Sequence, residues 1–270
     1  MMDLDPHALL AIGQAAIDEV QGEFRAGLGS DPLVVKEFGD FATETDLAIE
    51  NKLRKILVSM TGIPVYGEEY GGEFPGNQTV WVIDPIDGTT NYAAGFPACA
   101  IVLSLIHEGQ PIVGIIDMPF LGRRVTAAVG AGTHVNGRPV QMTLSESRPV
   151  TIAFGSVIAR GDGSFPRGWR QELLSGVGDA YRAIRISGSV GVDLASTAAG
   201  AFGGTVTFSP HVWDNAAGVL LIRESGGVVT DLEGAPWRVG SVGVLAGLPT
   251  VHARLLEVVR GIAPPPSFVA

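Results

Sequence analysis

The most informative part of the sequence is the run Trp81-Val82-Ile83-Asp84-Pro85-Ile86-Asp87-Gly88-Thr89-Thr90-Asn91. A β-rich segment, Thr79 to Ile83, ends directly in Asp84, and a second carboxylate, Asp87, follows after a proline that stiffens the turn. Gly88-Thr89-Thr90 then opens a predicted helix. Such a junction places both carboxylates at the edge of a sheet, beside the free N–H groups of a helix N-terminus.

This junction combines acidic side chains with a place that attracts anions. The N–H groups and dipole of a helix N-terminus favour phosphate, so carboxylates and phosphate share one place only when cations lie between them. Oxygen ligands and phosphate together indicate Mg²⁺. The chain has a net charge of −10, with 18 Lys and Arg against 28 Asp and Glu, so bound cations are the obvious source of positive charge.

An isolated pair such as Asp84 and Asp87 is more often a turn that caps a helix. Carboxylates at two further positions in the sequence weaken the interpretation of Asp84 and Asp87 as a helix cap. Glu68-Glu69 follows the predicted strand Ile63 to Tyr66 at once, and Asp214 stands at a predicted helix start after Trp213. Each alone could be a cap or a solvated turn, but three element ends that all offer carboxylates favour a shared metal site.

The segments around the junction predict helices followed by strands. One amphipathic helix starts at Asp5-Pro6 and continues through Phe24, and a second starts near Thr43 and stops at Gly62. The predicted strands are Ile63 to Tyr66, Thr79 to Ile83, Ile101 to Ile106, Pro111 to Asp117 and Val125 to Val129, followed by a turn at Asn136-Gly137. These strands indicate an antiparallel sheet.

From about residue 148 the pattern alternates between strands and helices. The predicted order is strand Val150 to Phe154, helix Arg167 to Gly176, strand Tyr181 to Ile186, helix Val192 to Ala201, helix Asp214 to Glu224 and a final hairpin that begins with Val228 to Asp231. We therefore expect one compact unit with a first half at residues 1–147, a second half at 148–263 and a loose tail at 264–270.

Composition excludes several classes of function. Hydrophobic residues make up 46% of the chain, which allows a sizeable core, and no apolar run approaches the ~18 residues of a membrane span. The acidic balance argues against nucleic-acid binding. Cys99, the single cysteine, lies in an apolar run and is best read as a packed thiol. No secretory signal is evident at the start, so a reducing cytoplasm is the simplest setting.

The sequence resembles the inositol monophosphatase family, the lithium-sensitive, Mg²⁺-dependent sugar phosphatases. Four ordered motifs carry the resemblance: Asp40-Phe41-Ala42-Thr43-Glu44-Thr45-Asp46, Gly67-Glu68-Glu69, Trp81 to Tyr92, and Trp213-Asp214-Asn215-Ala216-Ala217-Gly218 with Glu224-Ser225-Gly226-Gly227. They extend over nearly the whole chain. The resemblance implies a layered αβαβα fold in the α/β (α+β) class, and a homodimer.

The resemblance also assigns metal ligands. Glu68, Asp84 and the carbonyl of Ile86 would hold one Mg²⁺, while Asp84, Asp87 and Asp214 would hold a second. A third, weaker ion would bind near Glu68, so we expect two to three Mg²⁺ per site. Metals would neutralise the phosphate and generate hydroxide from bound water.

The family pattern implies substrate and catalytic residues as well. The N–H groups of Gly88 and Thr89 would hold the phosphate, and Thr89, with Asp46 behind it and Glu68 nearby, would activate the attacking water. Thr43-Glu44-Thr45-Asp46 also resembles a capping box, which would give Asp46 a structural role. The full set of implied substrate-binding residues is Asp87, Gly88, Thr89, Thr90, Ser189, Thr207, His211 and Asp214.

Substrate identity rests on one departure from the family pattern. Members that favour inositol phosphate often carry a glutamate at the position of Thr207, four residues before His211, and His211 could equally be structural. We expect hydrolysis of myo-inositol monophosphate. The alternatives are another small phosphate ester (histidinol phosphate, fructose 1,6-bisphosphate or phosphoadenosine phosphate) and a non-catalytic regulatory protein on the same fold.

Overall fold

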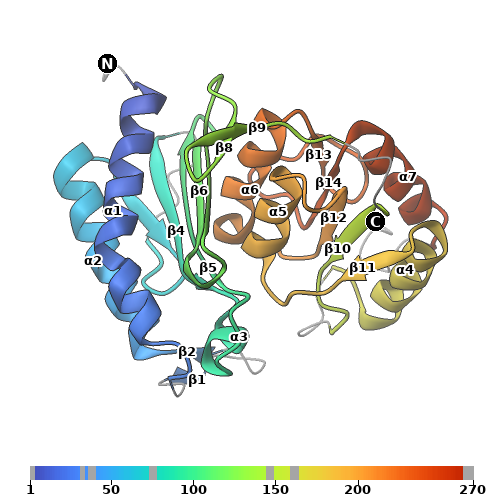
Figure 1. The fold of residues 1–270 in the computed structure, drawn as a ribbon, viewed down its shortest axis with the longest axis horizontal. Coiled ribbons are helices and arrows are strands. Elements are labelled where there is room, and N and C mark those ends of the chain that lie inside the picture. The colour runs from blue at the N-terminus through green and yellow to red at the C-terminus, as the bar shows by residue number, and fades with distance from the viewer. Residues whose placement is uncertain are drawn as a thin grey trace.

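The structure of the chain is a computed structural model that describes residues 4–30, 34–35, 41–72, 78–143, 149–158 and 164–263. Figure 1 shows five layers, in which helices and two sheets alternate. This is the αβαβα arrangement that the resemblance implies. Among the described residues, no helix has the length and apolar character that a membrane crossing requires.

The first sheet has seven strands in the order β3-β4-β5-β6-β7-β8-β9. Its pairs are antiparallel except for β3 and β4, which run parallel. The strands are β3 (Val65–Gly67), β4 (Val80–Asp87), β5 (Ala100–His107), β6 (Gln110–Met118), β7 (Arg123–Ala128), β8 (Thr133–Val135) and β9 (Arg138–Val140). Every residue of β4 is buried, because helices cover both faces of the sheet.

Helices α1 (Pro6–Ala26) and α2 (Glu44–Thr61) cover the outer face of this sheet (Figure 1). The side chain of Asp5 accepts the N–H of His7 at the start of α1, and Thr43 caps α2. Gly62 ends α2 with a φ of 68°, a conformation that favours glycine. Both predicted helices are therefore confirmed, with the starts and stops that the sequence indicates.

The second sheet has five strands in the order β11-β10-β12-β14-β13, with β11, β10 and β12 parallel and the others antiparallel. Its strands are β10 (Thr151–Phe154), β11 (Ala183–Arg185), β12 (Gly204–Thr207), β13 (Val228–Thr230) and β14 (Val244–Gly247). The remaining elements are α3 (Thr89–Ala93), α4 (Arg167–Ala180), α5 (Val190–Ala198), α6 (Val212–Glu224), α7 (Pro249–Arg260), the 3-10 turn η2 (Pro119–Leu121) and a small pair, β1 (Val34–Val35) with β2 (Phe41–Ala42).

Helices α5 and α6 lie between the two sheets and join the halves of the chain (Figure 1). Small residues allow this close packing. A Cβ added at Gly114 on β6 would lie 2.8 Å from the carbonyl oxygen of Ala217, and one at Gly218 would lie 2.4 Å from the Cβ of Leu194. The buried middle layer brings the end of β4 next to the starts of α5 and α6.

The structure corrects the predicted C-terminal part. The Asp231–Gly234 turn and a Thr230–Pro236 bridge form at the expected hairpin, but the hairpin is not final. Strand β14 follows, pairs with both β12 and β13, and leads into α7. The predicted boundary between the halves, at residues 147 and 148, and the predicted tail at 264–270 lie outside the described residues.

Candidate metal centre

Strand β4 delivers two carboxylates at its C-terminal end. Asp84 pairs in register with Val102 of β5, and the register then shifts before Asp87 pairs with Ala100. This bulge lets both aspartates point to one place, although they are three residues apart. The Asp84 carboxylate accepts the N–H of Ile86 at 3.0 Å, which fixes the bend. Gly88, with a φ of 86°, turns the chain into α3.

The third carboxylate comes from the second half of the chain. Asp214 lies in the first turn of α6, and its side chain accepts a hydrogen bond from the hydroxyl of Ser209. The amide of Asn215 fixes the approach to the helix, because it donates to the carbonyl oxygens of Ser209 at 3.0 Å and His211 at 2.7 Å. One oxygen each of Asp84, Asp87 and Asp214 lies within 4.8 Å of the other two.

The start of α5 holds Asp87 in place. The N–H of Gly191 donates to Asp87 at 2.7 Å, the N–H of Val190 donates at 3.1 Å, and the hydroxyl of Ser189 donates as well. The same hydroxyl accepts the N–H of Val192 as the N-cap of α5. A Cβ at Gly191 would lie 2.8 Å from the Asp87 carboxylate, so only glycine permits this approach.

The surroundings of the three aspartates disfavour their charged forms and raise their pKa values. Asp84 is 2% exposed and Asp87 is 6% exposed. Burial raises the pKa of Asp84 well above its ordinary value, and the charges of Glu68, Asp87 and Asp214 raise it further. Burial likewise raises the pKa of Asp87 to about 6, although its three donors oppose the rise. Burial and the charges of Asp87 and Glu68 raise the pKa of Asp214. Buried carboxylates in this state suit a divalent cation, which supplies the missing positive charge.

Glu68 lies beside this cluster without joining the group of three. It directly follows β3, and its N–H donates to the carbonyl oxygen of Ile83 at 3.1 Å, so it sits next to the end of β4. Its charge is among the causes that raise the pKa of Asp84, Asp87 and Asp214. The predicted ligands from three separate stretches are therefore gathered at one edge of the first sheet.

Asp46 caps its own helix, as the capping-box pattern predicts. Its carboxylate accepts the N–H of Thr43 at 2.8 Å and the hydroxyl of the same threonine. Burial raises the pKa of Asp46 to about 6, against the effect of these bonds, and the charge of Glu68 adds to the rise. The predicted partner Thr89 is half-buried, and its hydroxyl donates to the carbonyl oxygen of Ile86 at 3.0 Å. The catalytic roles of Asp46 and Thr89 stay predictions.

The remaining predicted substrate residues lie at different depths. Gly88 is half-buried and Thr90 is exposed at the start of α3. Thr207 is fully buried on β12, where its hydroxyl faces the side-chain oxygen of Asn215 at 3.5 Å. His211 is exposed, and its ring stacks on Trp213 with 4.5 Å between centroids.

Sequence reasoning missed several residues that support the cluster. Ser209 and Asn215 orient Asp214. Their hydrogen bonds depend on the path of the loop between β12 and α6, which no local sequence pattern predicts. Asp193, buried on α5, has a pKa raised to about 8 by burial, and its Oδ1 atom accepts no hydrogen bond from the described residues. A lone aspartate in a small-residue helix gives no signal of this state.

A cavity of about 420 Å³ lies elsewhere, between α1 and the β6–β7 connection. Its lining contains Arg25, Arg123 and Arg124 with two aspartates, but none of the cluster residues. Arg124 forms ion pairs with Asp18 and Asp117, each at 2.8 Å. Both aspartates of this cavity are thus paired with an arginine, which makes them less suited to hold a cation.

The three-aspartate cluster at the edge of the first sheet could hold a divalent cation, which is the equipment of a metal-dependent phosphatase. Residues 4–263 match the inositol monophosphatase family, and the chain belongs to that family. The family assignment inferred from the four sequence motifs is therefore confirmed.

Relatives and solved structures agree with this assignment. The chain is 44% identical to the inositol-1-monophosphatase ImpA of Mycolicibacterium smegmatis, covering 99% of this chain and 98% of the relative. It is also 44% identical to the probable inositol 1-monophosphatase ImpA of Mycobacterium tuberculosis, covering 96% and 97%. The inositol monophosphatase structure from Anabaena is similar with a TM-score of 0.83 and 27% identity, covering 96% of this chain and 97% of that one.

Proposed function

We propose that this chain hydrolyses myo-inositol monophosphate to inositol and phosphate with Mg²⁺ as cofactor. The observation that carries the proposal is the set of three aspartates whose oxygens lie within 4.8 Å of one another at the edge of a buried strand. The 44% identity to proteins named inositol-1-monophosphatase, over nearly the full length of each, supports the substrate.

The proposed ligands are Asp84, Asp87, Asp214 and Glu68, with the carbonyl oxygen of Ile86. Two to three bound Mg²⁺ ions would neutralise the phosphate and lower the pKa of the attacking water. The protein's own contribution is to hold these oxygens close together before substrate arrives. The bulge in β4, the donors at the start of α5 and Ser209 in the loop before α6 perform that task for the three aspartates.

Around the metal site, the remaining residues would bind substrate and move a proton. The N–H groups of Gly88 and Thr89 would donate to the phosphate, with Thr90 beside them. Thr89 and Asp46 would orient the water and accept its proton; the raised pKa of Asp46, about 6, suits a group that exchanges a proton near neutral pH.

The second half of the chain would form the wall that faces the inositol ring, with the exposed His211 as part of it. Ser189 would contribute through Asp87, to which its buried hydroxyl donates. Thr207 would contribute through Asn215, because its own side chain is buried. Threonine lacks the carboxylate with which a glutamate at this position would bind ring hydroxyls. We therefore expect weaker selection among inositol hydroxyls, without loss of phosphate binding.

Four finer properties belong to the same proposal. Lithium is expected to inhibit at millimolar or lower concentration by occupying the weakest cation position. The protein is expected to be a homodimer and to work in the cytoplasm. Its two halves, residues 1–147 and 148–263, are expected to act as one catalytic unit, since the cluster takes Asp84 from one and Asp214 from the other.

The test is phosphate release from a panel of inositol 1-phosphate, fructose 1,6-bisphosphate, histidinol phosphate and phosphoadenosine phosphate, with Mg²⁺ and with EDTA. We expect Mg²⁺-dependent release, fastest from inositol 1-phosphate. Faster release from another compound would overturn the substrate but keep the chemistry. Release that persists in EDTA, or that is unchanged in Asp87→Asn, would overturn the metal assignment. Absence of release from every compound would favour a regulatory protein.

A further inference from the structure

A second buried acid lies one turn beyond Asp46 on α2. Glu50 is 0% exposed, yet it is outside the group of three aspartates. A carboxylate removed from water is unfavourable unless it is paired and hydrogen-bonded. Its partners therefore indicate what the structure gains from it.

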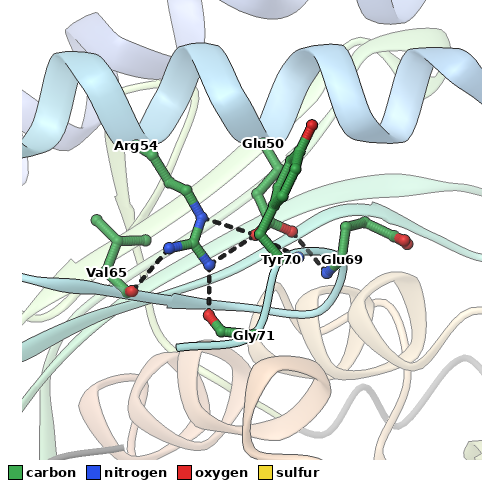
Figure 2. A network of polar contacts seen from close by, with 6 residues as sticks. All are labelled: Glu50, Arg54, Val65, Glu69, Tyr70 and Gly71. Carbon is green, nitrogen blue, oxygen red and sulfur yellow. Dashed lines mark hydrogen bonds and ion pairs between the residues drawn. The ribbon is translucent and has the colours of Figure 1, made fainter. Parts of the chain in front are cut away.

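Glu50 is bonded to the turn that carries Glu68. One carboxylate oxygen accepts the N–H of Glu69 at 2.8 Å, and the other accepts the N–H of Tyr70 at 3.1 Å (Figure 2). Two consecutive N–H groups that follow Glu68 thus point at the same side chain. Both oxygens of Glu50 accept hydrogen bonds from this turn, and Glu50 is not among the acids whose oxygens are grouped closely enough to hold a cation, so we treat it as a support for the turn.

Arg54 completes the support from the next turn of α2. Its guanidinium donates to Glu50 at 2.8 Å, to the carbonyl oxygen of Val65 at 3.0 Å and to that of Gly71 (Figure 2). Val65 begins β3 before Glu68, and Gly71 closes the turn after it. The planar fork of Arg54 therefore joins both ends of the segment, which a lysine could not do with the same geometry.

The fit between helix and turn leaves no spare room. A Cβ at Gly67 would lie 2.1 Å from a carboxylate oxygen of Glu50. The N–H of Gly67 donates to the carbonyl oxygen of Gly71 at 3.1 Å, so the turn is closed on itself. Glu68 is the first residue of this closed turn, and its backbone is held on one side by β4 and on the other by α2.

We propose that Glu50 and Arg54 are positioning residues that fix the Glu68 turn for Mg²⁺ binding. The inference rests on the proposed function, because it assumes that Glu68 is a ligand. Groups that orient the ligands of a metal commonly change metal affinity or activity by about 10–100-fold when they are lost. The ion pair with Arg54 also neutralises the charge of Glu50 behind the Glu68 turn.

The test compares three variants with the wild type: Glu50→Gln, Arg54→Met and Arg54→Lys. Lys55→Met is the matched control, since Lys55 is exposed on the same helix. The dissociation constant of Mg²⁺ is measured by calorimetry without substrate, and the Mg²⁺ concentration for half-maximal activity is measured separately. Thermal unfolding without Mg²⁺ identifies the temperature at which each variant is fully folded, and all binding is measured there.

We expect Glu50→Gln and Arg54→Met to weaken Mg²⁺ binding by about tenfold or more, with Arg54→Lys in between and Lys55→Met unchanged. A folded variant with lower thermal stability and wild-type Mg²⁺ affinity would overturn the inference, because the pair would then be structural only. If the wild type neither binds Mg²⁺ nor needs it, the proposed function fails instead, so the two failures are distinguishable. Should Glu50→Gln not fold, Arg54→Lys decides the question.

Discussion

Without Mg²⁺, the protein should lose stability as the pH rises from about 4 to about 7, and Asp87→Asn should remove part of that loss. Burial raises the pKa of Asp87 from 3.8 to about 6 in the folded protein. The folded state therefore holds this proton more tightly than the unfolded chain does. Its stabilising effect is complete below pH 3.8 and is lost as the pH rises through about 6.

The size of the effect follows from the two pKa values. Their difference, at about 1.4 kcal/mol per pKa unit, corresponds to roughly 3 kcal/mol of unfolding free energy. The charge of Asp87 also helps to raise the pKa of Asp84 and Asp214, so its removal acts in the same direction at those sites. At roughly 2–4 °C per kcal/mol for a chain of this size, the midpoint of thermal unfolding should move by about 6–12 °C.

The assay is urea unfolding of wild type and Asp87→Asn in EDTA at several pH values between 4 and 8. Asp46 also has a raised pKa, but both proteins contain it and the charge of Asp87 is not among the causes. The difference between the two curves therefore reports on Asp87 and on the acids whose pKa its charge raises, which are Asp84, Asp193 and Asp214. Saturating Mg²⁺ should restore stability to the wild type at neutral pH, because the ion binds the charged form. Parallel curves for the two proteins in EDTA would refute the reasoning.

Two further predictions concern the packing around the cluster, and each has its own control substitution. Gly218→Ala should destabilise the protein by about 1–3 kcal/mol, since the added methyl lies 2.4 Å from Leu194. Gly22→Ala on α1 is the control and should not destabilise it, because nothing lies within 4 Å of the added methyl. Urea unfolding measures both variants. Ser189→Ala should lower the unfolding free energy by about 1 kcal/mol, because the N-cap of α5 is lost, and it should also raise the pKa of Asp87. Ser189→Thr should restore both values. Carboxyl NMR titration in EDTA measures the pKa, and the same Asp87 titration in all three proteins would contradict this prediction.

Local chemistry explains which elements the sequence predicts well. The capped starts at Asp5 and Thr43 and the stop at Gly62 are contained within a few residues each, so α1 and α2 follow from sequence alone. The hairpin turn at Asn136-Gly137 is likewise local, with φ values of 49° and 76°. Cys99 is buried, as its apolar neighbours predict.

Other parts depend on contacts between distant residues. β14 is only four residues long and is defined by its pairing with β12 and β13, so the hydrophobic periodicity of the sequence does not predict it. Ser189 is a predicted substrate-binding residue, but the sequence gives no sign that its hydroxyl donates to Asp87, a residue 102 positions earlier. The sequence indicates which side chains carry the chemistry, but not which of them hold the others in place.

The arrangement of the cluster links metal binding to the joining of the two halves. Asp84 and Asp87 belong to the first sheet, while Asp214 and the donors to Asp87 belong to helices α5 and α6. Asp84 and Asp87 are buried and Asp214 is half-buried, and bringing these three carboxylates together is unfavourable without a cation, as their raised pKa values show. The contacts between α5, α6 and the first sheet must offset that cost in the metal-free protein. A bound cation removes the repulsion, and it should therefore strengthen the same contacts that built its site.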